Sequence, residues 1–120
     1  MADTKNKFIG NKGEELATNW LMQNNYVILH RNWRFKKTEV DIIASKNNVL
    51  HFVEVKTRTN DKYGLPEESI TNQKMEALKK AAAAFLEEFT TWKNIQFDVM
   101  AITLDSKNLP TYFLIEDVYF

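Results

Sequence analysis

The segment 52–58, FVEVKTR, constrains the fold of this chain more than any other. Its β-branched and aromatic residues favour a strand, which we expect to span residues 49–58. Side chains alternate across a strand, so Glu54 and Lys56 share one side at a spacing of about 6.6 Å, and the valines share the other. An acid and a base on one side of an apolar strand indicate either an ion pair or a site for a metal ion and a phosphate.

The rest of the pattern predicts one α+β domain over residues 1–120, in the order α-β-β-β-α-β-β. Apolar residues at helical spacing predict helices at 8–24 and 70–89. Further strands are predicted at 26–35, 39–44, 97–104 and 111–115. A polar turn at 45–48 predicts a hairpin between 39–44 and 49–58, and a surface loop is expected at 59–68. Within 39–44 we expect Val40 and Ile42 on one face, and Glu39, Asp41 and Ile43 on the other.

Composition excludes several classes of protein. The chain has no cysteine, so disulfides, thiolate metal sites and cysteine nucleophiles are excluded. It lacks a signal-peptide pattern and any apolar run of about 20 residues, which predicts a cytoplasmic protein with no membrane association. Its 16 basic and 16 acidic residues balance to a net charge of zero. Residues 1–37 nevertheless carry seven bases against three acids, which suits either a polyanionic partner or an ordinary lysine-rich surface.

Asp41 is the natural companion of Glu54 and Lys56. Its neighbours in sequence are apolar, and the predicted hairpin puts it on the strand beside Glu54, about 4.8 Å away. Two carboxylates at that separation repel each other unless a proton or a cation lies between them. Mg²⁺ suits the position because it takes oxygen ligands and keeps water and phosphate in its shell. Lys56 would then orient a water molecule or stabilise charge on a phosphate.

This ordered set of residues resembles the PD-(D/E)XK nuclease motif. The fold that the resemblance implies is a restriction-endonuclease-like αβββαβ core, a mixed central sheet flanked by helices, similar to that of archaeal Holliday junction resolvases. The resemblance is closest to the YraN-like family of small bacterial proteins. One departure is Thr38, where that family usually has glycine. The matching segments are 13–17 (GEELA), 31–34 (RNWR), 39–44 (EVDIIA), 52–58 (FVEVKTR) and 63–64 (YG).

The resemblance implies a metal-dependent nuclease site that uses Mg²⁺ or Mn²⁺. Asp41, Glu54 and the Val55 carbonyl would be the metal ligands. Lys56 would be the catalytic base or an electrostatic stabiliser, and Glu14 an outer carboxylate of the catalytic set. The residues that would contact the substrate are Lys74, Gln73, Arg58 and Tyr63.

Three functions remain open at this point. The first is a metal-dependent endonuclease that hydrolyses phosphodiester bonds in branched or single-stranded DNA, as in repair or recombination. The second is a non-catalytic DNA-binding or protein-interaction module on a nuclease fold, which the zero net charge favours. The third is a small protein partner with no role in nucleic-acid chemistry. A resolvase-like activity would need a homodimer, and the aromatic residues available for its interface are Tyr112, Phe113, Tyr119 and Phe120.

Each candidate residue also has an ordinary structural explanation. Glu54 and Lys56 could form a surface ion pair that contributes about 0–1 kcal/mol. Glu14 could be an acid near a helix N-terminus, and Lys74 a solvated lysine. Glu39 is expected at a strand start in solvent, and His51 is expected to be an ordinary strand residue.

Overall fold

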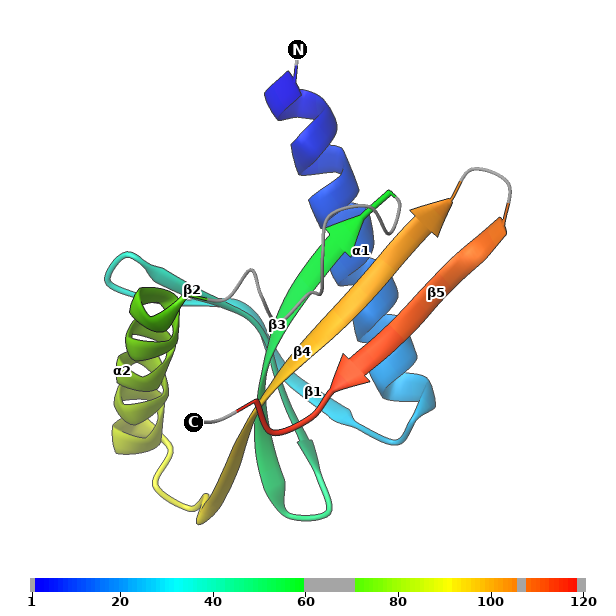
Figure 1. Cartoon of the computed structure of the whole chain (residues 1–120). Coiled ribbons are helices and arrows are strands. Elements are labelled where there is room, and N and C mark those ends of the chain that lie inside the picture. Colours follow the sequence, from blue (N-terminus) through cyan, green and yellow to red (C-terminus); the bar gives the residue numbers. More distant parts are fainter. Residues whose placement is uncertain (1, 60–70, 106–107, 119–120) are drawn as a thin grey trace.

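A five-stranded mixed sheet forms the centre of the molecule (Figure 1). The computed structural model describes residues 2–59, 71–105 and 108–118. The sheet order is β1-β2-β3-β4-β5, and β3 and β4 are the parallel pair among antiparallel neighbours. This is the predicted restriction-endonuclease-like arrangement. The elements are α1 (Ala2–Gln23), β1 (Val27–Phe35), β2 (Thr38–Lys46), β3 (Val49–Arg58), α2 (Asn72–Glu88), β4 (Asn94–Asp105) and β5 (Asn108–Ile115).

The hairpin between β2 and β3 is tighter than predicted. Lys46 and Val49 form its last pair, so the turn consists of two residues instead of the expected four. Both of these, Asn47 and Asn48, have positive φ, at 53° and 65°. A two-residue turn with two left-handed positions matches the twist of its strands, and asparagine tolerates that conformation. The predicted β2–β3 pairing is confirmed.

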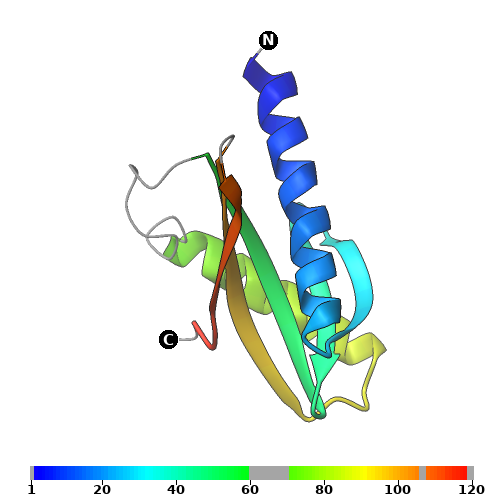
Figure 2. The ribbon, with the colours of Figure 1, turned by 90° about the vertical axis from the view of Figure 1, so that its right-hand side faces the viewer.

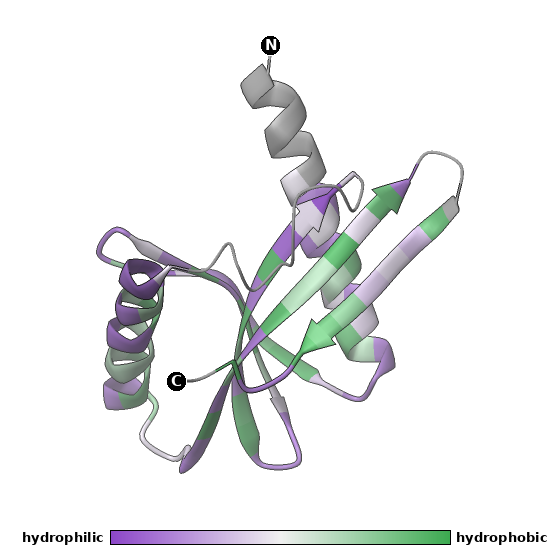
Figure 3. Ribbon diagram, viewed as in Figure 1, coloured by the Kyte–Doolittle hydropathy of each residue, from purple (hydrophilic) through white to green (hydrophobic). Residues whose placement is uncertain are grey.

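The two helices cover opposite faces of the sheet, as the side view shows (Figure 2). Polar and apolar residues alternate along α2, and both kinds occur along the strands of the sheet (Figure 3). The buried cluster on the α2 side consists of Val40, Ile43, Leu50, Phe52, Met75, Leu78, Ala81, Ala82, Phe85 and Phe97. The cluster on the α1 side consists of Ala17, Leu21, Tyr26, Ile42, Ala44, Val53, Met100 and Ile102.

The prediction that Val40 and Ile42 share a face of β2 is wrong. Val40 packs on the α2 side, whereas Ile42 packs on the α1 side. The regular alternation is therefore broken at Asp41, between them. The pairing of β2 with β3 also ends here, at Ile42 and Val53, and the two strands then diverge (Figure 1). A break in alternation where pairing ends lets a strand bend and redirects one side chain, here that of Asp41.

Close packing holds α1 against β3 at one glycine. A Cβ atom on Gly13 would overlap the side chain of Thr57, so the helix can approach the strand this closely only because Gly13 has no side chain.

Aromatic pairs contribute to the packing on both sides of the sheet. Trp20 stacks on Tyr112 on the α1 side, with ring centroids 6.2 Å apart. Trp33 meets Phe85 edge-on at 5.3 Å on the α2 side.

The first helix begins earlier than predicted, at Ala2 instead of residue 8. Of the five apolar residues at helical spacing that predict α2, Leu78, Ala81, Ala82 and Phe85 are buried, whereas Phe89 is the C-cap just beyond the helix and is half-buried. Within the described ranges, neither helix has the length and apolar character needed to cross a membrane.

Candidate functional site

The candidate site lies in the gap where β2 and β3 diverge. Asp41 Oδ2 accepts a hydrogen bond of 2.8 Å from the backbone N–H of Val55. The carboxylate therefore takes the position of a strand partner on that edge of β3. The N–H and C=O groups of one strand residue point to the same edge, so the Val55 carbonyl also faces the gap.

Glu54 is the most enclosed acid of the site, with 8% of its surface exposed. Its Oε1 atom lies 3.7 Å from the Nζ atoms of both Lys56 and Lys74. Its Oε2 atom is buried and has no hydrogen-bond partner among the described residues. One half of this carboxylate is thus paired with cations, while the other half has an unfilled capacity to bind a cation or a proton.

The N-terminus of α2 brings Lys74 to the site. Thr71 caps the helix, and its hydroxyl oxygen accepts a hydrogen bond of 3.1 Å from the backbone N–H of Lys74. This cap starts the helix beside the gap, where the Lys74 side chain reaches Glu54 from a different element than Lys56 does.

Burial and mutual repulsion weaken the acidity of both central carboxyl groups. The pKa of Glu54 is raised from 4.5 to about 7, first by burial and then by the negative charge of Asp41, against the opposing effect of the two lysines. The pKa of Asp41 is also raised, mainly by burial, although its bond from the Val55 N–H opposes the rise. The pair therefore favours a bound proton or cation.

Glu14 on α1 adds a further acid to Asp41 and Glu54, and these three acids together with Glu39 form the acidic group of the site. Burial is the main reason that its pKa is raised, followed by the charges of Asp41 and Glu39. With the Asn32 amide oriented so that its nitrogen faces the acids, Nδ2 donates to Glu14 Oε1 at 2.8 Å and to Glu39 Oε1 at 3.0 Å. The acids of the group thus lie on three elements, α1, β2 and β3.

Asn32 is a residue that the sequence analysis did not assign to the site. It has a positive φ of 54° within β1, and that conformation aims its amide at the two acids. The sequence feature that indicates this conformation is an asparagine that interrupts an otherwise alternating strand. Glu39 also departs from expectation. Its side chain is 36% exposed and lies 3.5 Å from Arg34, so it belongs to the edge of the acidic group and is not simply solvated.

The four predicted substrate-contact residues do not all gather at the site. Lys74 contacts Glu54 directly. Gln73, one residue earlier, is exposed and faces a separate hollow beside the β1–β2 turn. Arg58 is partly buried at the end of β3, two positions beyond Lys56. Tyr63 lies outside the described residues. The roles assigned to all of these residues stay predictions.

The oxygen atoms of the gap fit Mg²⁺ in chemistry. The carboxylates of Asp41 and Glu54 and the Val55 carbonyl are hard oxygen donors, which Mg²⁺ and Mn²⁺ prefer, and Glu54 Oε2 has no other partner among the described residues. Within the part of the chain that the structure describes, no three histidine or acidic side chains converge as a complete metal-binding group. Water and phosphate oxygens would have to complete the shell, which is usual for Mg²⁺.

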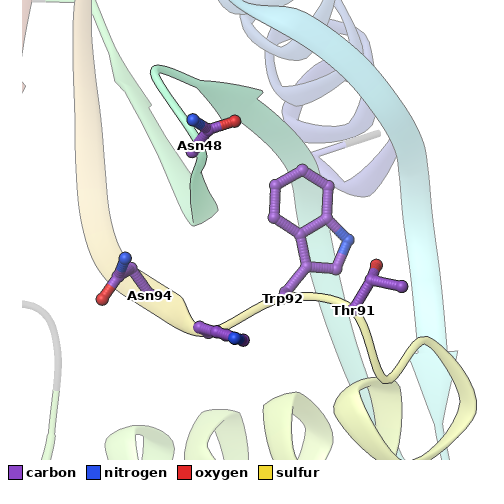
Figure 4. A pocket seen from close by; sticks show the side chains of 5 residues that line it. Asn48, Thr91, Trp92 and Asn94 are labelled. Atoms are coloured by element: carbon purple, nitrogen blue, oxygen red, sulfur yellow. The ribbon is translucent and has the colours of Figure 1, made fainter.

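The hollow in Figure 4 is a different feature, at the opposite end of the sheet. It measures about 360 Å³ and lies between the β2–β3 turn and the segment that enters β4. Asn48, Thr91, Trp92, Lys93 and Asn94 line it, so it has no carboxylate with which to hold a cation.

A buried pair on the α1 side was not predicted from the sequence. His51 Nδ1 and Asp98 Oδ2 are 2.7 Å apart, with residue exposures of 5% and 1%. Asp98 Oδ1 further accepts hydrogen bonds from Gln96 Nε2 and from the backbone N–H of Asp117, both at 2.9 Å. His51 lies in β3, as expected, but its side chain is buried and paired with Asp98, which the sequence did not indicate. Parallel pairing puts Gln96 opposite His51 and Asp98 opposite Val53, and this register could not be obtained from the sequence.

The fold and the acid–lysine arrangement define a restriction-endonuclease-like α+β protein. The sequence profile of a family described as "Uncharacterised protein family UPF0102" matches residues 13–102. The chain belongs to this UPF0102 family, the YraN-like family that its motifs resemble.

Relatives in several bacteria align over most of their length. A UPF0102 protein of Caldicellulosiruptor saccharolyticus is 46% identical over 102 residues, which cover 83% of this chain and 86% of the relative. A UPF0102 protein of Chloroherpeton thalassium is 42% identical over 122 residues, with 95% of each chain covered. One of Flavobacterium johnsoniae is 37% identical over 115 residues, which cover 92% of this chain and 94% of the relative.

Proposed function

We propose that this protein is a metal-dependent endonuclease that hydrolyses phosphodiester bonds in branched or single-stranded DNA. The observation that carries the proposal is the environment of Glu54. This buried carboxylate is repelled by Asp41 and has two lysines beside Oε1, while its Oε2 atom has no hydrogen-bond partner among the residues that the structure describes. Acids that share a cation next to lysines that bind phosphate form the arrangement that metal-assisted phosphodiester hydrolysis needs.

Each residue has a defined task in this mechanism. Asp41, Glu54 and the Val55 carbonyl would hold Mg²⁺ in the gap between β2 and β3. The ion would supply positive charge at the scissile phosphate and lower the pKa of a water molecule. Lys56, beside Glu54, would orient that water or accept its proton. Lys74 would approach a phosphate oxygen from α2 and stabilise the negative charge that develops there.

A cleavage assay with matched variants tests this function. Wild-type protein with Mg²⁺ or Mn²⁺ should cleave a branched or single-stranded oligonucleotide, and Glu54→Gln should reduce the rate by about 10²-fold or more. Lys93→Gln, at the far end of the sheet, should cleave like wild type. Equal cleavage by wild type and Glu54→Gln would assign the activity to another site or to a contaminant.

One observation favours the second candidate, a non-catalytic nucleic-acid-binding module. Lys56 and Lys74 both lie 3.7 Å from Glu54, so the acid has cationic partners without any metal ion. Calorimetry with Mn²⁺ separates the two functions. Heat of binding at millimolar Mn²⁺ that is lost in Glu54→Gln supports the nuclease. Absence of metal binding, together with salt-dependent DNA binding, supports the module.

A further inference from the structure

A second hollow lies beside the candidate site, between the β1–β2 turn and the first turns of α2. It measures about 450 Å³, within the range of about 300–1,000 Å³ that is typical of ligand pockets. Figure 1 shows the β1–β2 turn close to the N-terminal end of α2. The residues that line the hollow are Phe35, Lys36, Thr38, Gln73, Glu76, Ala77 and Lys80.

Positive charge stands on both walls of this hollow. Lys36 belongs to the turn and Lys80 to the helix, and both are exposed. In the described part of the chain neither has an acidic partner, although Lys36 Nζ lies 5.3 Å from the centre of the Phe35 ring. The acid of the lining, Glu76, is offset by Lys79, whose Nζ atom is 3.5 Å from Glu76 Oε1. The walls are therefore suited to an anion.

Apart from the two lysines and Glu76, the residues that line the hollow are uncharged. Phe35 and Ala77 supply apolar surface, and Thr38 and Gln73 supply groups that form hydrogen bonds. Cations that follow a phosphate backbone, combined with an aromatic residue for the bases, are typical of sites for single-stranded nucleic acid. A duplex keeps its bases stacked inside and would present only phosphates to such a lining.

We propose that this hollow binds an unpaired DNA strand and leads it to the candidate site. The continuity comes from α2, where Gln73 faces the hollow and the next residue, Lys74, contacts Glu54. The lysines at positions 36 and 80 would bind successive phosphates, and Phe35 would lie against a base. Cleavage of the bound strand at Glu54 rests on the proposed function, whereas binding of the strand in the hollow does not depend on it.

Binding measured without cleavage tests the hollow separately from the chemistry. The probe is a fluorescent oligothymidylate titrated with full-length protein in EDTA, followed by anisotropy, with a duplex of equal length as comparison. Lys36→Gln combined with Lys80→Gln should weaken binding roughly tenfold at low salt and reduce the single-strand salt slope by about 1.4. The control, Lys46→Gln combined with Lys93→Gln, removes the same charge at the far end of the sheet and should change binding less than twofold.

The outcomes distinguish the inference from the proposed function. Three results would each overturn the single-strand site, even if the protein cleaves DNA. They are an equal loss of affinity in the two double variants, tighter binding of the duplex than of the single strand, and displacement of the oligonucleotide by poly-glutamate as readily as by unlabelled oligothymidylate. A loss confined to the first double variant supports the site even if no cleavage occurs with Mn²⁺, in which case only the nuclease proposal fails. Phe35→Leu, which keeps the apolar packing, should weaken binding of the oligonucleotide without changing the salt slope.

Discussion

Asp41 on β2 and Val55 on β3 are joined by a hydrogen bond of 2.8 Å from a backbone N–H to a carboxylate. It lies just beyond the last regular pair of the two strands, Ile42 and Val53, one position further on β2 and two positions further on β3. The carboxylate accepts the N–H group of Val55 at a position where β2–β3 pairing has ended. The same bond positions Asp41 beside Glu54, so the end of strand pairing creates the candidate site.

Two replacements of Asp41 should separate the effect of its hydrogen bond with Val55 from the effect of its negative charge. Asp41→Asn keeps an oxygen that can accept from Val55, whereas Asp41→Ala leaves a partly buried N–H without a partner. We expect the alanine variant to be less stable than the asparagine variant by about 1–3 kcal/mol in urea unfolding with EDTA. Both should lose any stabilisation by Mn²⁺. Equal stabilities would mean that water replaces the carboxylate at Val55.

The stability of the metal-free protein should fall as the pH rises from about 4.5 to about 7. Glu54 ionises near 4.5 in the unfolded chain, but its pKa in the folded protein is about 7. Between these values the unfolded state loses its proton first, which favours unfolding. The loss is at most about 3 kcal/mol, and it is complete above pH 7.

Glu54→Gln provides the comparison for this pH effect. The amide cannot ionise, so the stability difference between the variant and wild type should grow in favour of the variant between pH 4.5 and 7.5 in EDTA. Urea unfolding at four pH values measures it. A difference that does not change with pH would show that the pKa of Glu54 is not raised in the folded protein.

Two glycines of α1 should respond in opposite ways to alanine. At Gly13 a new Cβ would overlap Thr57, so Gly13→Ala should force α1 away from β3 and cost about 1–3 kcal/mol. At Gly10 nothing lies within 4 Å of the new atom, so Gly10→Ala should stabilise the helix by up to about 1 kcal/mol. Thermal unfolding of both variants gives the comparison. The close contact is refuted if Gly13→Ala is as stable as Gly10→Ala.

Loss of Asp98 should destabilise the fold without affecting the candidate site. Its carboxylate lies 2.7 Å from His51 Nδ1 and accepts from Gln96 and the backbone of Asp117, so Asp98→Ala leaves several buried groups unpaired. We expect a cost of about 3 kcal/mol or more in urea unfolding. The exposed control Glu87→Ala should stay within about 0.5 kcal/mol of wild type. If Asp98→Ala and Glu87→Ala change the free energy of unfolding by similar amounts, the His51–Asp98 pair contributes little to stability.

The order of elements was predictable because local patterns determine it. The stripe of α2 and the apolar strand 49–58 are periodic over enough residues to be recognised, and both match the structure. The placement of Asp41 and Glu54 on neighbouring strands followed from the hairpin. The faces of β2 could not be predicted, because the break at Asp41 depends on where pairing with β3 ends.

The remaining site residues depend on contacts that no local pattern encodes. Asn32 joins Glu14 to Glu39 across three elements, and Lys74 reaches Glu54 because Thr71 starts α2 beside the gap. For the predicted homodimer, Tyr112 is engaged with Trp20, while Phe113 is 60% exposed. Tyr119 and Phe120 lie outside the described residues, and the dimer stays a prediction.

The indole rings of Trp20 and Trp33, on opposite sides of the sheet, make the two helical layers optically distinguishable. Trp20 contacts Tyr112 on the α1 side, and Trp33 contacts Phe85 on the α2 side. The chain has three tryptophans, and the third, Trp92, also packs on the α2 side. A protein that keeps only Trp20 would emit from the α1 layer alone, and one that keeps only Trp33 from the α2 layer. Intrinsic fluorescence can therefore show which layer loosens first during unfolding.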